Sequence, residues 1–155
     1  MIKKVITDSP YDLIFETIKR ITQQETYRFD NSVKIPHEAG VYLIYKKPYK
    51  NKEFSYVGQS QQLYARLDSI RKASLRNHIL VRKIAKEYHE TDRNKLKEII
   101  HNNYEFSFIA TKSTELALVI ESIIIRIFKK QLSYNKAKIY QYEEEFEELA
   151  NLLPV

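Results

Sequence analysis

The sequence predicts an α+β fold, a small three-stranded antiparallel sheet flanked by helices, and three observations lead to it. Two runs rich in β-branched and aromatic residues, 41–46 and 54–57, stand on either side of turn-forming residues, as in a β-hairpin. A third run, 104–109, alternates large apolar residues with polar ones, as a half-buried strand does. The remaining chain repeats many apolar residues with helical spacing, and its 155 residues suit one hydrophobic core.

The first element along the chain is a helix over about 9–24. A serine followed by a proline suits its first positions, and Ile14, Ile18 and Ile21 then recur on one helical face. Residues 25–39 are predicted to connect this helix to the first strand, and the proline near their end favours an extended backbone there.

Helices are predicted again after the hairpin. Leu63, Leu67 and Ile70 mark the apolar face of one helix, because they recur at intervals of three and four residues. A second helix fits residues 77–88, and a short one fits 95–102. The third predicted strand, 104–109, follows directly.

The strongest helical pattern covers about 114–130 and begins after Ser113, a suitable N-cap. The end of the chain is amphipathic, with glutamates around its apolar residues, and predicts a final helix. No repeat, low-complexity tract or glycine-serine linker interrupts the chain. We therefore predict one domain, residues 1–155, with a core over about 36–136 and helical extensions over 1–30 and 140–155.

The charge of the chain is positive and unevenly distributed. The sequence has 26 Lys and Arg against 20 Asp and Glu, a net charge of +6, but residues 141–155 hold five glutamates and no basic residue. Residues 1–140 therefore have 26 basic and 15 acidic side chains, a net charge of +11. Such a surface favours a polyanionic partner, although basic proteins without one also have it.

Composition also excludes several classes of protein. The chain has no cysteine, which rules out disulfide frameworks, zinc-thiolate sites and a cysteine nucleophile. The first residues lack the apolar core of a signal peptide, and the longest apolar run, 116–128, is interrupted by charges and too short for a membrane span. We therefore expect a soluble, cytoplasmic protein without a membrane partner.

Two charged residues are predicted to lie on apolar helix faces: Glu121 in helix 114–130, and Arg66 among the apolar residues of the helix after the hairpin. A buried carboxylate needs a cation, hydrogen-bond donors or a metal ion, so Glu121 is either paired with Arg66 or another basic residue, or a ligand for a divalent metal. Arg66 is suited either to pair with Glu121 or the carboxyl end of a helix, or to hold a phosphate through two donors. The residues alone leave both alternatives open.

The two glycines of the chain each stand beside a tyrosine, in Gly40-Val41-Tyr42 and Tyr56-Val57-Gly58. Because side chains alternate along paired strands, the hairpin can bring the two phenols to one patch. The chain has 12 tyrosines, so this pair alone is weak evidence of a site. Gly40 is expected to permit close backbone entry into the first strand, and Gly58 to release the second strand into the next loop.

These triplets belong to a longer series. Arg66 follows them, Glu121 lies in LALVIESIIIRIF, and Asn135 lies in LSYNK near the end of the core. In this order and spacing the residues resemble the GIY-YIG nuclease family over about 36–136. Each triplet is a short pattern that recurs by chance, but five elements in order are a stronger signal. The resemblance implies a metal-dependent endonuclease, of restriction or mobile-element type, that hydrolyses phosphodiester bonds of DNA.

The resemblance also implies a role for each side chain. Glu121 would hold one Mg²⁺ or Mn²⁺ ion per active site, and Arg66 would neutralise charge on the phosphoryl oxygens. One of Tyr42 and Tyr56 would orient or deprotonate the attacking water. We favour Tyr42, whose pKa of about 10 would have to be lowered for it to act as a base. Asn135 would fix the site by hydrogen bonding near the helix of the metal ligand.

Two more residues enter through the resemblance. Lys46 is predicted on the same strand side as Tyr42, where it would assist with the phosphate or the water. Some restriction enzymes of the family have a histidine one turn after the arginine, where this chain has Ile70. His78 is the nearest histidine, and we expect it at the surface of a basic helix, among the residues that contact nucleic acid.

The partner implied is nucleic acid, most simply double-stranded DNA, bound by the catalytic domain itself because no length remains for a separate binding domain. The residues expected to contact phosphates are Lys47, Lys50, Lys52, Arg71, Lys72, Arg76, His78, Arg82, Lys83 and Lys86. The alternatives are a nuclease for RNA or branched DNA, or a non-catalytic binding module on the same fold. A homo-oligomer is also compatible with the sequence.

Overall fold

The structure, a computed structural model, describes residues 10–31 and 33–136. Every strand pairing within this part of the chain is antiparallel, and the sheet has the order β1-β4-β2-β3. The strands are β1 Tyr27–Arg28, β2 Gly40–Lys46, β3 Tyr56–Ser60 and β4 Tyr104–Ala110. The helices are α1 Pro10–Gln23, α2 Leu63–Arg71, α3 Ile79–Tyr88, α4 Arg93–Asn103 and α5 Thr114–Ile127. The predicted α+β class with an antiparallel sheet is confirmed.

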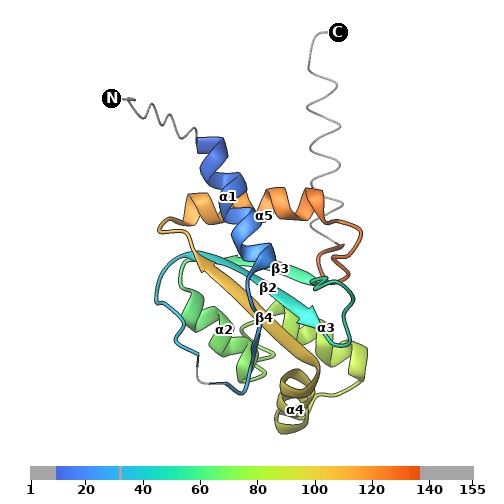
Figure 1. Ribbon diagram of the computed structural model, residues 1–155. Helices are drawn as coiled ribbons and strands as arrows, with labels where there is room; N and C mark the ends of the chain where they lie inside the picture. The colour runs from blue at the N-terminus through green and yellow to red at the C-terminus, as the bar shows by residue number, and fades with distance from the viewer. Residues whose placement is uncertain (1–9, 32, 137–155) are drawn as a thin grey trace, which may run out of the picture.

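The sheet lies between two layers of helices. Figure 1 shows α1 and α5 on one face of the sheet and α2, α3 and α4 on the other. Strand β2 lies between β4 and β3, and its side chains alternate between the two apolar clusters, with Leu43 directed toward α5 and Ile44 toward α2 and α3. Because both faces are covered, residues 40–45 of β2 are all buried. The candidate residues Tyr42 and Tyr56 belong to the cluster on the α2 and α3 side.

Local sequence signals, such as caps and helical spacing, correctly predicted features of the helices. Ser113 caps α5 as expected, because its side chain accepts a hydrogen bond from the Leu116 backbone N–H at 3.1 Å. On α1, Ile18 and Ile21 are buried as their spacing predicted. In the described part of the chain, none of the helices has the length and apolarity that a membrane span requires.

The structure corrects three predicted details of the sheet, and one predicted helix lies outside the described residues. A fourth, two-residue strand, β1, lies in the segment 25–39 that we expected to be only a connection, since it pairs with the edge of β4. Strand β3, Tyr56–Ser60, begins and ends later than the predicted strand over 54–57. Gly58 therefore lies inside β3, paired with β2, and does not release the strand into a loop. The final helix predicted over 140–155 lies outside the described residues.

Candidate active site

Tyr42 and Gly58 face each other across β2 and β3. A Cβ atom placed on Gly58 would lie 2.3 Å from both Cζ and Oη of Tyr42, so the end of the phenol occupies the space that any side chain at position 58 would need. The Tyr56 ring lies beside it, with 6.0 Å between the ring centroids. The hairpin therefore brings the two phenols together, and Gly58 is the residue that makes room for one of them.

Gly40 has a packing role at the start of β2. A Cβ atom there would lie 2.3 Å from the Ile109 carbonyl oxygen and 2.5 Å from Cδ1 of Leu63. Neither glycine of the chain has a positive φ, so close approach, and not backbone conformation, explains both. Gly40 therefore lets the first turn of α2 pack closely against β2, the strand that carries Tyr42. A close approach at the start of this strand is the role that the sequence predicted for Gly40.

His78 is not at the surface, where we expected it. The side chain is fully buried, because His78 is the N-cap of α3 and its ring is directed inward. Nδ1 accepts a hydrogen bond from the Leu80 backbone N–H at 3.1 Å, and Nε2 lies 2.9 Å from the Tyr42 hydroxyl. Direct contact with nucleic acid is therefore excluded in this arrangement. A polar residue immediately before an apolar helical run was the sequence signal for this cap.

The hydrogen bonds define the tautomer of His78. Since Nδ1 accepts from a backbone N–H, it carries no proton, and a neutral ring must then carry its proton on Nε2. Burial, together with the positive charges of Arg66 and Arg82, lowers the pKa of His78 to about 3, so the ring is neutral near pH 7. His78 therefore donates a hydrogen bond to the Tyr42 oxygen.

The Tyr42 hydroxyl is held in its neutral form. Burial raises its pKa well above 10, and the charge of Tyr56 raises it further, whereas the charge of Arg66 lowers it. A hydrogen bond with Tyr56 and the charge of Glu121 also raise the pKa of Tyr42. A hydrogen bond raises a phenol pKa when the phenol is the donor, which agrees with a Tyr42 oxygen that accepts from His78.

Arg66 and Glu121 belong to helices on opposite faces of the sheet, α2 and α5. Glu121 is 1% exposed, as expected of a carboxylate on an apolar helix face, while Arg66 is only partly buried. Both charges act on Tyr42, with opposite effects on its pKa. Yet within the described residues the Arg66 guanidinium forms no ion pair, with Glu121 or with another carboxylate. The alternative of a simple ion pair between them is therefore wrong.

Asn135 holds the strand that carries Tyr56. Its Oδ1 accepts from the Val57 backbone N–H at 2.9 Å, and its Nδ2 donates to the Val57 carbonyl at 3.0 Å. Strand β3 is at the edge of the sheet, so these bonds replace those that a further strand would make. Asn135 is 3% exposed and fixes the backbone between Tyr56 and Gly58.

The structure places Lys46 in a different cluster. It lies on the Tyr42 side of β2, but its amino group forms an ion pair with Glu87 on α3 and lies 5.5 Å from the centre of the Tyr88 ring. The Tyr134 hydroxyl also donates to Glu87, and it lies 2.8 Å from the Tyr104 hydroxyl. Burial and the bond to Glu87 raise the pKa of Tyr134 to about 12. Nothing in the sequence pattern indicated this second cluster.

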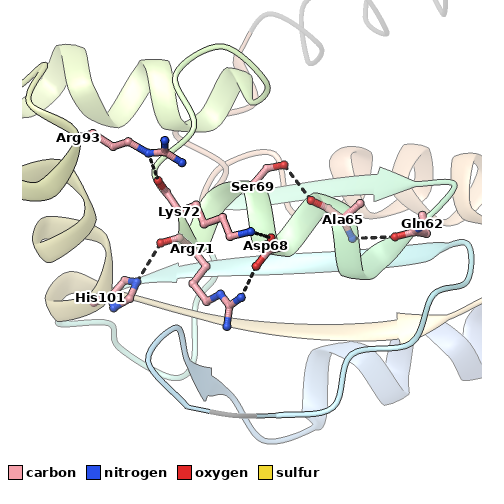
Figure 2. Close-up of polar contacts among 8 residues, drawn as sticks. All are labelled: Gln62, Ala65, Asp68, Ser69, Arg71, Lys72, Arg93 and His101. Carbon is pink, nitrogen blue, oxygen red and sulfur yellow. Dashed lines mark hydrogen bonds and ion pairs between the residues drawn. The ribbon is translucent and has the colours of Figure 1, made fainter.

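The helix that carries Arg66 is fixed at both ends, as Figure 2 shows. At its start, Gln62 accepts a hydrogen bond from the Ala65 backbone N–H at 3.0 Å. At its end, two side chains of α4 hold the backbone: Arg93 donates to the Lys72 carbonyl at 2.9 Å, and His101 lies 3.0 Å from the Arg71 carbonyl. These contacts cap the start of α2 and hold its end against α4, and so help to position its arginine.

The basic residues expected to contact nucleic acid are not equivalent. Arg71 and Lys72 both pair with Asp68, which offsets part of their charge (Figure 2). Other members are engaged elsewhere: Arg82 donates to the carbonyls of residues 75 and 76, and Lys83 to that of Tyr134. Lys47 lies 4.0 Å from the Glu105 carboxylate. The exposed members are Lys50, Lys52, Lys72, Arg76, Arg82 and Lys86.

An open cleft of about 540 Å³ adjoins Arg66. It extends from the first turns of α2 to the start of α5, and its lining includes Gln59, Gln61, Asn77 and Leu118. In residues 10–31 and 33–136, no group of three or more His, Cys, Asp or Glu side chains could hold a metal ion. Glu121 is the carboxylate whose charge acts on Tyr42 together with that of Arg66.

Comparison with known proteins yielded solved structures only. No family model matches the chain, and no curated protein matches it. The structure is similar to that of the magnesium-bound GIY-YIG N-terminal endonuclease domain of UvrC from Thermotoga maritima, with a TM-score of 0.42 and 20% identity over 80% of this chain and 97% of that one. An asparagine point mutant of the same domain gives a TM-score of 0.41 and 22% identity over 77% and 94% of the two chains. Both are domains of the family that the motif residues resemble.

Proposed function

We propose that this chain is a nuclease that hydrolyses phosphodiester bonds, with double-stranded DNA as substrate and one Mg²⁺ or Mn²⁺ ion in its site. One observation carries the proposal: the buried Tyr42 hydroxyl on β2 lies 2.9 Å from His78 and beside the Tyr56 ring, where the charges of Arg66 on α2 and Glu121 on α5 both act on it. Charged and polar groups gathered in this way at one point are typical of sites that stabilise developing charge.

Arg66 is the phosphate-binding residue in this proposal. Its guanidinium is partly buried, lines the cleft and forms no ion pair among the described residues. A guanidinium can hold two phosphate oxygens at once through parallel N–H donors. Because the charge is not neutralised by Glu121, it remains available for a substrate phosphate and for the charge that builds up on it during hydrolysis.

Glu121 suits a single hard cation. A carboxylate supplies the oxygen ligands that Mg²⁺ prefers, and Mg²⁺ commonly keeps several waters when few protein ligands are present. The absence of a larger acidic or histidine cluster within the described residues argues for one ion and against a two-metal site. When bound, such an ion supplies Lewis-acid stabilisation of negative charge on phosphate oxygens.

The two phenols and His78 would orient the attacking water. Because burial raises its pKa, Tyr42 stays protonated near neutral pH in this arrangement. We therefore assign Tyr42 the orientation of the attacking water, and not the role of a base that the sequence favoured. His78 donates to its oxygen and Tyr56 lies beside it, which restricts the direction of the hydroxyl. Asn135 keeps Tyr56 in register by its bonds to Val57.

Cleavage of supercoiled plasmid DNA in the presence of Mg²⁺ tests this proposal. We expect Glu121→Gln and Arg66→Ala each to lower the rate by roughly 10²–10³-fold, as removal of one stabilising group does in other enzymes. Matched controls are Glu115→Gln, an exposed glutamate on the same helix, and Arg20→Ala, an exposed arginine on α1. Cutting that survives both active-site changes would show that another site, or a contaminant, is responsible.

The same preparation should be offered duplex DNA, branched DNA and RNA of matched length. Preferred cutting of duplex DNA with recurring end sequences would support a restriction-type enzyme. Preferred cutting of branched DNA or RNA would show that the substrate is not duplex DNA, while phosphodiester hydrolysis would remain the reaction. Salt-sensitive binding with no cutting of any substrate, in Mg²⁺ or Mn²⁺, would reject the enzyme and leave a binding module.

A further inference from the structure

We propose that the open cleft beside Arg66 is a nucleobase-binding site, which reads the base next to the phosphate held by that arginine. This inference rests on the nuclease function proposed above and adds base selectivity to it. The volume of about 540 Å³ falls within the roughly 300–1,000 Å³ typical of small-molecule sites. The cleft is open to solvent, so a base of a bound strand can enter from outside.

The chemistry of the lining favours a base over a second phosphate. Gln59, Gln61 and Asn77 contribute uncharged amides, and Arg66 is the basic side chain among the residues that line the cleft. Amides offer a donor and an acceptor side by side, the arrangement with which Asn and Gln pair with base edges. Backbone phosphates are instead bound mainly by cationic groups, which here lie elsewhere on α2 and α3.

Gln59 provides an independent indication of a ligand. Its Oε1 is buried and finds no hydrogen-bond partner among the residues that the structure describes. An unsatisfied buried acceptor is unfavourable, so a structural role alone does not explain a glutamine at this position. An amino or imino group of a nucleobase is a donor that would satisfy it.

The other residues that line the cleft suit the flat face of a base. Leu118, on α5, lines the cleft and is 44% exposed, although it is a large apolar residue. On α2, Ala65 and Ser69 are small, and Figure 2 shows them one after the other along the helix that begins after Gln62. A lining that combines amides with apolar and small side chains matches the two properties of a nucleobase, its polar edge and its apolar face.

The test is selection of bound sequences from a random-sequence DNA duplex library by the full chain in EDTA, where cleavage does not interfere. We expect a base preference at one or two adjacent positions, reduced about tenfold in Gln61→Ala and in Asn77→Ala, both exposed in the structure. Asn102→Ala, an exposed residue of α4, is the control and should keep the preference.

Gln59→Leu separates the binding role from a structural one. Because it replaces an unsatisfied amide with an apolar group of similar size, we expect the free energy of unfolding to stay equal or rise while the base preference falls. An unaltered preference in all three cleft variants, or binding without any preference, overturns this inference but not the nuclease. No binding and no cutting by the unmodified chain overturns both.

Discussion

The Tyr42 hydroxyl lies 2.9 Å from Nε2 of His78, whose Nδ1 accepts a hydrogen bond from the Leu80 backbone N–H at 3.1 Å. One imidazole ring therefore joins the start of α3 to the central strand of the sheet. Because Nδ1 is already an acceptor, the neutral ring donates from Nε2, and the phenol oxygen has a defined acceptor role. The orientation of a candidate catalytic hydroxyl thus depends on a helix cap 36 residues away in the sequence.

Replacement of His78 by asparagine should change how stability depends on pH. The pKa of His78 is lowered in the folded protein to about 3, below the value of about 6.5 for an unfolded chain. As pH falls below about 6.5, the unfolded state takes up a proton that the folded state does not, so stability is lost by up to about 1.4 kcal/mol per pH unit. His78→Asn keeps a cap side chain and should lack this contribution.

Urea unfolding at several pH values between about 6.5 and 5 measures the difference, since other histidines are common to both proteins and the carboxylates are still ionised. If the free energy of unfolding depends on pH equally in the wild type and in His78→Asn, a buried neutral histidine is contradicted. A steeper loss of this free energy with falling pH in the wild type supports it.

Gly58→Ala should displace Tyr42. The added Cβ would lie 2.3 Å from Cζ and Oη of the phenol, which is held in a packed core, so we expect a loss of roughly 1–3 kcal/mol in the free energy of unfolding. The matched background is Tyr42→Leu, whose side chain lacks both atoms. There the same Gly58→Ala change should cost clearly less. Equal costs in the two backgrounds would mean that the glycine serves another purpose.

Asn135→Ala should loosen β3. The change removes both side-chain hydrogen bonds to Val57 and leaves a backbone N–H and carbonyl without these partners at a buried position. We expect a loss of roughly 1–3 kcal/mol in stability and faster hydrogen exchange at the Val57 amide. Asn94→Ala, an exposed asparagine of α4, is the control. Unchanged hydrogen exchange at the Val57 amide would show that the Asn135 side chain does not hold β3 in place.

Lys50 and Lys52 are exposed at the hairpin tip and should contribute to the salt dependence of DNA binding. If each contacts one phosphate, replacing both by glutamine lowers the slope of log K against log salt concentration by about 2. Lys97→Gln, also exposed but on α4 at the opposite end of the molecule from α5 (Figure 1), should leave the slope unchanged. Equal effects of the three lysines would indicate a general charge effect without defined contacts.

The elements of this fold were predictable where the signal is local. Helical spacing predicted α5, a serine predicted its cap, and alternation predicted β4, because each depends on residues close together in the chain. The two-residue β1 was missed, since it exists only through pairing with β4. Gly58 was placed at a strand end for a similar reason: its contact with Tyr42 depends on the register of two strands.

By itself, the sequence determined the candidate residues, because a carboxylate and a guanidinium on apolar helix faces and two tyrosines beside the only glycines stand out in the local pattern. Only the tertiary structure decided their state. The burial of His78, the raised pKa of Tyr42 and the absence of an ion pair between Arg66 and Glu121 all depend on solvent exclusion and on distances between distant segments. Residue types set which groups can react, and packing sets their charge and direction.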